Sequence, residues 1–164
     1  MATSGTTSFN LDIDDIIQEA YERCGMRTNS GYDLKSARRS LNILFAEWGN
    51  RGIHLWKVEL KEQLLTAGTA TYSAPSNAND ILEAYISTTT STTTATNDVS
   101  LTKISRSEYA ALPNKGNRGQ PSQYYVDRQT TPTITLYQTP DASTFTYLKY
   151  YYLKRIEDAG AYTN

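Results

Sequence analysis

Few side chains in this sequence could carry acid–base, nucleophilic or metal chemistry. There is one histidine, His54, and one cysteine, Cys24. A Ser-His-Asp or Cys-His device would have to use His54, and one His with one Cys builds no zinc site without several carboxylates. His54 is next to Leu55 and Trp56, so we interpret it as a packed or surface histidine. Cys24 falls at an apolar helical position, which is typical of a buried thiol. We therefore expect no metal and no cofactor.

Two further patterns could be taken for chemical sites. A glycosidase needs two carboxylates converging on a cleft, but the acidic residues of the first helix lie mainly off its apolar stripe and indicate a solvated face. They are Asp12, Asp14, Asp15, Glu19 and Glu22. The basic, glycine-rich segment 114–121 resembles a phosphate cradle but lacks the strand–loop–helix context, so we interpret it as a mobile loop. No Walker or GxGxxG motif is present, and we predict that the protein is not an enzyme.

Two amphipathic helices are predicted to open the chain. The first has a 3.6-residue apolar stripe, a possible cap at Asn10 or Asp12 and a stop at Gly25. Its stripe is Ile13, Ile16, Ile17, Ala20, Tyr21 and Cys24. After a polar turn at 27–32, the second helix ends at Gly49 and Gly52. Its stripe is Leu34, Ala37, Leu41, Leu44, Phe45 and Trp48. The short turn predicts an antiparallel pair with Trp48 in its core, so Trp48→Ala should cost about 3–5 kcal/mol.

The rest of the chain favours strands. Residues 58–60 and 69–72 suggest two strands on either side of a turn at 66–68. Further strands are expected at 81–87, 99–104, 123–127, 133–138 and 145–153. Ser105 and Glu108 form a capping box that starts a short helix. The low-complexity run 88–97 is either a hairpin tip, which we favour, or a loop that reaches a neighbour. The predicted class is α+β: an N-terminal antiparallel helix pair, then a mostly antiparallel β-sheet region with one short helix.

Length and composition limit the organisation and the partners. A chain of 164 residues favours one domain over 1–164. Within it we expect a helix pair at 10–52, a strand-rich region at 53–158 and flexible ends at 1–9 and 159–164. Sixteen basic and seventeen acidic side chains give a net charge of −1, which argues against a stand-alone nucleic-acid binder. We expect no membrane partner, since no polybasic run occurs and no apolar run approaches roughly 20 residues. The N-terminus lacks the features of a signal peptide.

Two segments carry a resemblance to a known family: DIIQEAYERCG at 15–25 and ARRSLNILFAEWGNRGI at 37–53. Together they resemble the head–tail adaptor proteins of short-tailed phages, namely the tail accessory factor of P22-like phages and tail tubular protein A of T7-like phages. The family pattern falls on Asp15, Ile16, Ile17, Ala20, Gly25, Ala37, Leu41, Asn42, Ala46, Glu47, Trp48, Gly52 and Ile53. Residues 56–58, 67–75 and 150–158 resemble, more loosely, the strand insertion of marine members.

The resemblance implies a structural subunit of the virion at the head–tail junction, assembled in the host cytoplasm. It implies a dodecameric ring beneath the phage portal protein, with tail tube or nozzle proteins bound below. The genome would pass through the channel without sequence-specific binding. We expect the chain alone to be a monomer or a mixture of small species, with the ring forming on the portal.

Nine residues are candidates for contacts between subunits or with partners. They are Arg38, Arg39, Glu47, Arg51, Lys115, Arg118, Tyr150, Tyr151 and Tyr152. The Arg38–Arg39 patch could equally form ion pairs within the subunit, and the Tyr150–Tyr152 strand could pair with a neighbour's sheet edge. Two other functions stay open. The Tyr- and Thr-rich strands suggest a receptor- or carbohydrate-binding module of the virion, and Glu47 suggests a carboxylate-based peptidoglycan hydrolase.

Overall fold

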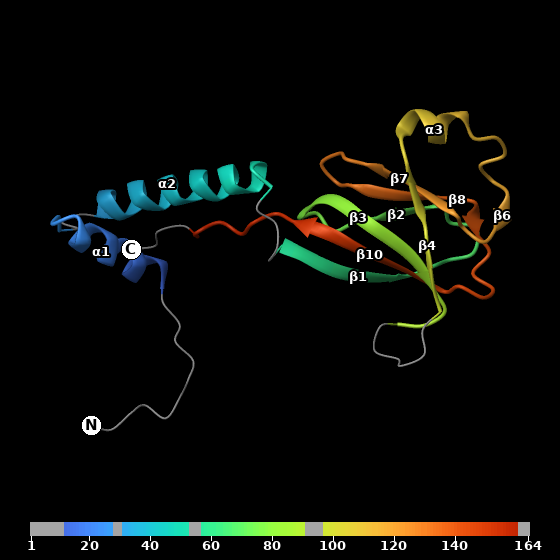
Figure 1. Ribbon diagram of the computed structural model, residues 1–164, viewed down its shortest axis with the longest axis horizontal. Helices are drawn as coiled ribbons and strands as arrows, with labels where there is room; N and C mark the ends of the chain where they lie inside the picture. Colours follow the sequence, from blue (N-terminus) through green and yellow to red (C-terminus); the bar gives the residue numbers. More distant parts are fainter. Residues whose placement is uncertain (1–11, 28–30, 53–56, 91–96, 161–164) are drawn as a thin grey trace, which may run out of the picture. The chain divides into compact units, whose positions relative to one another are not determined.

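The computed structural model describes residues 12–27, 31–52, 57–90 and 97–160 (Figure 1). Two helices come first and are followed by antiparallel-rich sheets and one short helix, so the predicted α+β class is confirmed. The chain forms two compact units. The first is Met1–Ile53 with Ile156–Asn164, and the second is His54–Arg155. The strand-rich unit is therefore inserted into the helical unit, and the assignment of 1–164 to one domain stays a prediction.

Helix α1, Ile13–Arg23, is fixed at both ends by its sequence. Asp12 is in an extended conformation and its side chain accepts a hydrogen bond from the Ile13 amide at 2.6 Å, which confirms the predicted cap. Gly25 has φ of +73°, a left-handed conformation that favours glycine, so the predicted stop is also confirmed. Asn10, the other possible cap, lies outside the described residues. Cys24 is exposed, and the prediction of a buried thiol is wrong because the helix ends before that position is covered.

Helix α2, Gly31–Asn50, begins earlier than predicted and ends where predicted, between Gly49 and Gly52. It begins inside the expected turn and runs through Gly49, because one glycine in a long helix costs only about 1 kcal/mol. The helix packs beside α1 in the opposite direction (Figure 1). None of its described side chains is fully buried, and Trp48 is half-buried against Phe45, with ring centroids 5.9 Å apart. The prediction of a deeply buried Trp48 is wrong, so Trp48→Ala should cost less than the range given above.

Two four-stranded sheets form the second unit. One has the order β1-β10-β3-β4, with strands Val58–Leu64, Tyr147–Lys154, Ala78–Ser87 and Asp98–Ser100. The other has the order β2-β8-β7-β5, with strands Thr71–Ser73, Thr133–Tyr137, Gln123–Asp127 and Thr102–Ile104. A short ladder joins β6, Arg118–Gly119, to β9, Thr139–Pro140. The pairs are antiparallel except β5–β7 and β6–β9, which are parallel.

The connections between the sheets differ from the predicted strands. The expected strand at 99–104 is divided at Leu101, whose amide donates to the Ala84 carbonyl at 2.9 Å while the chain crosses from one sheet to the other. The turn at 66–68 forms, but β1 and β2 on either side of it join different sheets. Strands β3 and β4 pair antiparallel with Ser87 opposite Asp98, as a hairpin requires. Residues 91–96 of the low-complexity run lie outside the described residues.

Helix α3, Arg106–Ala111, begins with the predicted capping box. The Ser105 hydroxyl accepts from the Glu108 amide at 3.2 Å, and the Glu108 carboxylate accepts from the Ser105 amide at 2.7 Å. Tyr109 of this helix stacks on Tyr125 of β7, with ring centroids 5.6 Å apart. The capping box and the ring contact together place the short helix on the second sheet.

The hydrophobic core of the second unit consists of the facing sides of the two sheets. Its fully buried apolar side chains come from β3, β7, β8 and β10, and include Ile81, Ile86, Tyr124, Ile134, Leu136, Leu148 and Tyr150. Strand β10 lies between β1 and β3 and is paired along both edges. The expectation that the Tyr150–Tyr152 strand offers a free edge to a neighbour is therefore wrong.

Two buried tyrosines form a matched pair for measuring hydroxyl burial. The Tyr150 hydroxyl is buried and has no hydrogen-bond partner among the described residues, whereas the Tyr124 hydroxyl donates to the Leu82 carbonyl at 3.3 Å. An unsatisfied buried polar group costs about 1–3 kcal/mol. We expect Tyr150→Phe to leave the unfolding free energy unchanged or to raise it, and Tyr124→Phe to lower it by about 1 kcal/mol. Chemical denaturation of both variants tests this, and a larger loss for Tyr150→Phe would contradict the geometry.

Candidate functional site

Arg38 on α2 joins three segments of the helical unit. Its Nε and Nη2 atoms lie 2.8 and 2.6 Å from Asp14 Oδ1 on α1, and its Nη1 donates to the Ala159 carbonyl at 3.3 Å. The side chain is 13% exposed. The rigid guanidinium can make several directed hydrogen bonds at once, which suits a junction of this kind. The Arg38–Arg39 patch was predicted to form either contacts with a neighbouring subunit or ion pairs within the subunit. Arg38 forms an ion pair within the subunit.

Asn42, one turn further along α2, holds the same returning segment. Its side-chain oxygen accepts from the Ala159 amide at 2.7 Å. Ala159 is 2% exposed, so both polar backbone groups of a buried residue are satisfied by α2. The prediction of a flexible end at 159–164 is wrong for Ala159, which is packed. Residues 161–164 lie outside the described residues. Asn42 belongs to the pattern that carries the family resemblance, and this hydrogen bond gives it a structural role.

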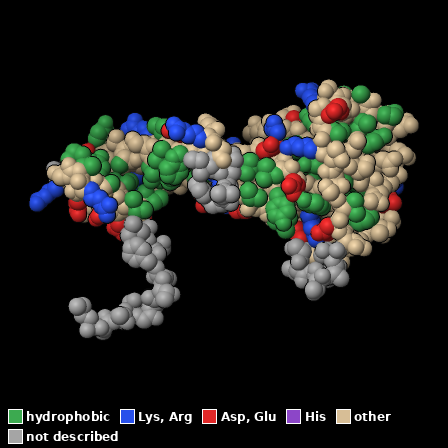
Figure 2. Space-filling model, in the orientation of Figure 1, with side chains coloured by type: hydrophobic (Ala, Val, Ile, Leu, Met, Phe, Trp, Pro, Cys, Tyr) green, Lys and Arg blue, Asp and Glu red, His purple; other side chains and the backbone are tan. Residues whose placement is uncertain are grey.

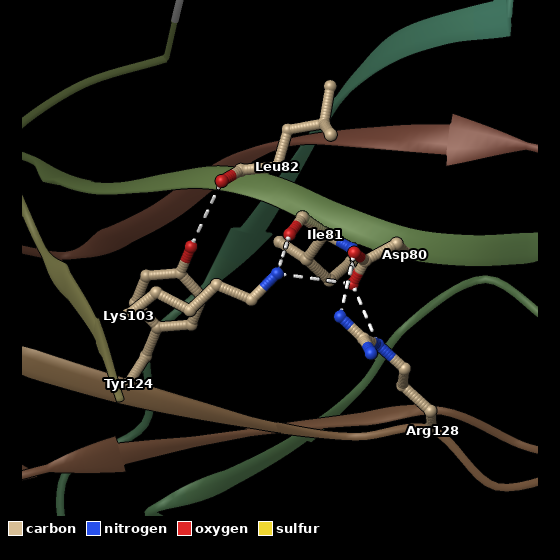
Figure 3. A network of polar contacts seen from close by, with 6 residues as sticks. All are labelled: Asp80, Ile81, Leu82, Lys103, Tyr124 and Arg128. Atoms are coloured by element: carbon tan, nitrogen blue, oxygen red, sulfur yellow. Dashed lines mark hydrogen bonds and ion pairs between the residues drawn. The ribbon is translucent and has the colours of Figure 1, made fainter. Parts of the chain in front are cut away.

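A charged network centred on Asp80 ties together three elements of the second unit (Figure 3). Asp80 on β3 accepts from Lys103 Nζ on β5 at 3.2 Å. Arg128, which follows β7, donates to both carboxylate oxygens of Asp80, at 3.1 and 2.8 Å. Lys103 also donates to the Ile81 carbonyl. The network spans both sheets because β3 belongs to one and β5 and β7 belong to the other.

Asp80 is half-buried, and its pKa reflects two opposed effects. Burial alone would raise the pKa, but the hydrogen bonds and charges of Arg128 and Lys103 outweigh it, so the pKa lies below 3.8. A carboxyl group whose pKa is lower in the folded state contributes stability above its unfolded pKa and loses that contribution as the pH falls through the folded pKa.

We expect Asp80→Asn to lower the unfolding free energy at pH 7 by about 1–2 kcal/mol. The difference from the unmodified protein should begin to shrink as the pH falls below the unfolded pKa, near 3.8. It should disappear below the lower folded pKa, where Asp80 is protonated in the folded protein as well. Denaturation curves at neutral and acidic pH measure this. A difference that stays constant with pH would show that the charge of Asp80 does not contribute.

Lys149 on β10 is a buried cation between two carboxylates. The residue is 4% exposed, and its Nζ lies 3.2 Å from Asp98 Oδ1 and 4.0 Å from Glu62 Oε1. The pKa of Asp98 is lowered first by a hydrogen bond with Ser87 and then by Lys149, against the opposing effect of burial. This site was not predicted from the sequence. A lysine within the strand sequence YLKYYYLK was the available signal.

The other candidate interface residues of the helical unit are on the surface of α2. Arg39 is exposed and makes no ion pair with a described residue. Glu47 and Arg51 form an exposed ion pair one turn apart. Exposed pairs of this spacing contribute little to stability, about 0.3–0.5 kcal/mol.

In the second unit, most of the candidate interface residues serve internal contacts. Lys115 donates to the Ala110 and Leu112 carbonyls at 3.0 and 2.9 Å, at the end of α3. The guanidinium of Arg118 packs against Gly68. A Cβ added to Gly68 would lie only 2.9 Å from Arg118 Nη2. Segment 114–121, which was predicted to be a mobile loop, contains β6, and the backbone of β6 pairs with β9. Tyr150 and Tyr152 are buried, while Tyr151 between them is exposed. A role of any of the nine residues in an interface stays a prediction.

Each unit has an open depression on its described surface. Between α1 and α2 there is a mainly apolar groove of about 310 Å³, lined by Ile16, Ile17, Ala20, Tyr21, Ala37, Ser40, Leu41 and Leu44. In the second unit, a pocket of about 600 Å³ is lined by residues 103–106 and 125–128. Its only tyrosine is Tyr125, which stacks on Tyr109.

No metal-binding group of three or more His, Cys, Asp or Glu residues occurs in the part of the chain that the structure describes. His54 lies outside that part. None of the described helices is long and apolar enough to cross a membrane.

Four polar side chains each connect one segment of the chain to another: Arg38, Asn42, Asp80 and Lys149. The chain matches the SU10 adaptor protein family over residues 8–163 and belongs to that family. It is therefore a phage adaptor protein and a component of the virion, in a family of structural proteins that is not a class of enzymes. No curated protein matches the chain. The adaptor part of the predicted resemblance is confirmed, and the closer likeness to the P22-like and T7-like proteins stays a prediction.

Proposed function

We propose that this chain is the repeating subunit of a head–tail connector in a short-tailed phage. The subunits would form a ring, a dodecamer by resemblance, between the portal and the tail, and the genome would pass through its channel. The observation that carries the proposal is the match to the adaptor family over nearly the whole chain. The helical segments on which the resemblance to head–tail adaptors rests belong to one compact unit, which supports a shared role for them.

The mechanism would be geometric. A ring requires each subunit to present two different surfaces, one to each neighbour, in a heterologous contact that closes. The internal ties support such a role, because Arg38 and Asn42 fix the returning segment on α2 and so define the shape of the helical unit. Close packing of like subunits is also favoured by a net charge of −1, which adds little mutual repulsion.

The partners would be the portal above the ring and tail tube or nozzle proteins below it. DNA would be cargo only. Proteins that hold DNA do so mainly by neutralising phosphates with an excess of Lys and Arg over Asp and Glu. This chain has no such excess. A near-neutral subunit would therefore let the genome slide through without a sequence-specific hold.

Mass measurement of the purified chain, with and without the portal protein of the same phage, tests the proposal. We expect the chain alone to be a monomer or a mixture of small species. On the portal, local concentration would drive ring formation, giving a complex whose added mass is a whole ring of subunits. Absence of any complex with the portal would contradict the connector role, and a stable ring without portal would contradict the order of assembly.

The carbohydrate-binding alternative is less well supported. It predicts a pocket of converging tyrosines, but the described pocket lined by residues 103–106 and 125–128 has a single tyrosine, Tyr125. The hydrolase alternative needs a partner acid for Glu47, and this side chain is instead paired with Arg51 on the helix surface.

A further inference from the structure

The helical unit leaves one side of its helix pair covered and the other side open. At 100° per residue, Arg38 and Asn42 lie on one flank of the α2 face that meets α1, and there the returning segment is packed with Ala159 buried. Ala37 and Leu44 lie on the other flank, where the apolar groove is open. Ile16 on its α1 side is 46% exposed. The groove is thus a hydrophobic surface that this chain's described residues leave uncovered.

A second apolar surface lies on the opposite side of α2. Tyr32 and Ile43 are the most exposed large hydrophobic residues described, at 71% and 64%. Helical geometry places Lys35 and Arg39 on the same stripe, opposite Leu41. Neither Lys35 nor Arg39 makes an ion pair with a described residue. We call Tyr32, Lys35, Arg39 and Ile43 the outer stripe of α2.

The charges beside these two surfaces are complementary. Asp12, the N-cap of α1, and Glu19 are one turn to either side of Ile16 and are exposed, so carboxylates flank the α1 edge of the groove. Glu19 also pairs with Arg23 on the same helix, an exposed ion pair that contributes little and can be exchanged for a contact with another copy. The outer stripe of α2 carries the positive charges of Lys35 and Arg39, and Glu47, one turn beyond Ile43, is paired with Arg51. Figure 2 shows hydrophobic side chains along the helical unit with acidic and basic groups beside them. A positively charged apolar stripe and a negatively rimmed apolar groove fit each other in both polarity and sign.

We propose that the outer stripe of α2 in one copy packs into the α1–α2 groove of the next copy. Lys35 and Arg39 would then face Asp12 and Glu19 across the contact. The stripe and the groove are different surfaces, so the contact is heterologous and propagates from copy to copy until a ring closes. This inference rests on the proposed ring function and names the contact that would build it.

Disulfide trapping between copies tests the contact directly. Cys24 is exposed and is first replaced by serine; Ile16→Cys and Ile43→Cys are then made in separate chains. Both positions are partly exposed, so both variants should fold, and thermal melts check this. Mixed on the portal and oxidised, they should give a covalent dimer. The control mixes Ile43→Cys with Leu82→Cys, a similarly exposed position in the second unit, and should give none.

Charge reversal provides the second arm of the test. Arg39→Glu should lower the yield of rings on the portal by about tenfold or more, and adding Glu19→Arg in the same chain should restore it. Rings that form normally in Arg39→Glu, with no Ile16–Ile43 crosslink, would overturn this contact but leave the ring function intact. A crosslink from Ile16→Cys to the portal alone would also overturn it. Failure of the unmodified chain to form any ring would instead overturn the proposed function.

Discussion

Asp98→Ala should lower the unfolding free energy by about 3 kcal/mol, because it leaves the buried ammonium of Lys149 poorly compensated. Glu62, at 4.0 Å, is then the remaining carboxylate beside Lys149, so we expect the lower end of the usual range for a broken buried pair. Lys149→Met should cost clearly less. It removes the buried charge itself, and the carboxylates left behind are more exposed to water than the lysine was.

Equilibrium denaturation of the two variants measures this asymmetry. Glu19→Ala is the matched control, because it breaks an exposed helix pair with Arg23 and should change stability by less than about 1 kcal/mol. Equal losses in Asp98→Ala and Lys149→Met would contradict the account of Lys149 as a desolvated cation. A loss in Asp98→Ala no larger than that of the control would contradict it as well.

Raising the pH from 10 to 12 should destabilise the second unit strongly. Burial raises the pKa of Tyr124 and of Tyr150 to about 12, against 10.0 for an exposed tyrosine. Above pH 10 the unfolded chain therefore loses the protons of these two tyrosines, which the folded chain keeps, and the balance shifts toward unfolding. The contribution of the two protonated hydroxyl groups to the unfolding free energy is complete below pH 10, and it is lost as the pH rises through their folded pKa. Each tyrosine should account for on the order of 2 kcal/mol.

Denaturation at several alkaline pH values, followed by tyrosinate absorbance, tests the second prediction. The double variant Tyr124→Phe/Tyr150→Phe has the same buried rings without the ionisable groups and should lose much less stability over this range. A parallel decline in both proteins would assign the alkaline sensitivity to other residues.

The local parts of the fold could be predicted from the sequence. Asp12 and Gly25 define the ends of α1, Ser105 and Glu108 cap α3, and the strand expected at 123–127 is β7. Each of these signals lies within a few residues, where backbone conformation and hydrogen bonding are decided locally. The fold class follows from the order of such elements.

The long-range pairing could not be predicted in the same way. Strand β10 inserts between β1 and β3, which are far from it in the sequence, and no local pattern encodes such a choice. The division at Leu101 had no signal either, because β4 and β5 are adjacent in the chain yet belong to different sheets. Likewise, the position of Ala159 on α2 depends on contacts across more than one hundred residues.

The candidate residues show the same limit. Arg38 was identified, but its role depends on where Asp14 and Ala159 lie in space. Asp80 and Lys149 were missed because their partners come from other strands. Residue type suggests which groups can interact, and the topology decides whether they meet.

The central claim, that the protein joins head to tail, is tested most directly by electron microscopy of particles made without it. A phage carrying an early stop codon in this gene should yield DNA-filled heads that lack tails. Purified protein added with free tails should restore complete particles. Complete tailed particles that merely fail to attach to cells would contradict the connector role and favour a receptor-binding module instead.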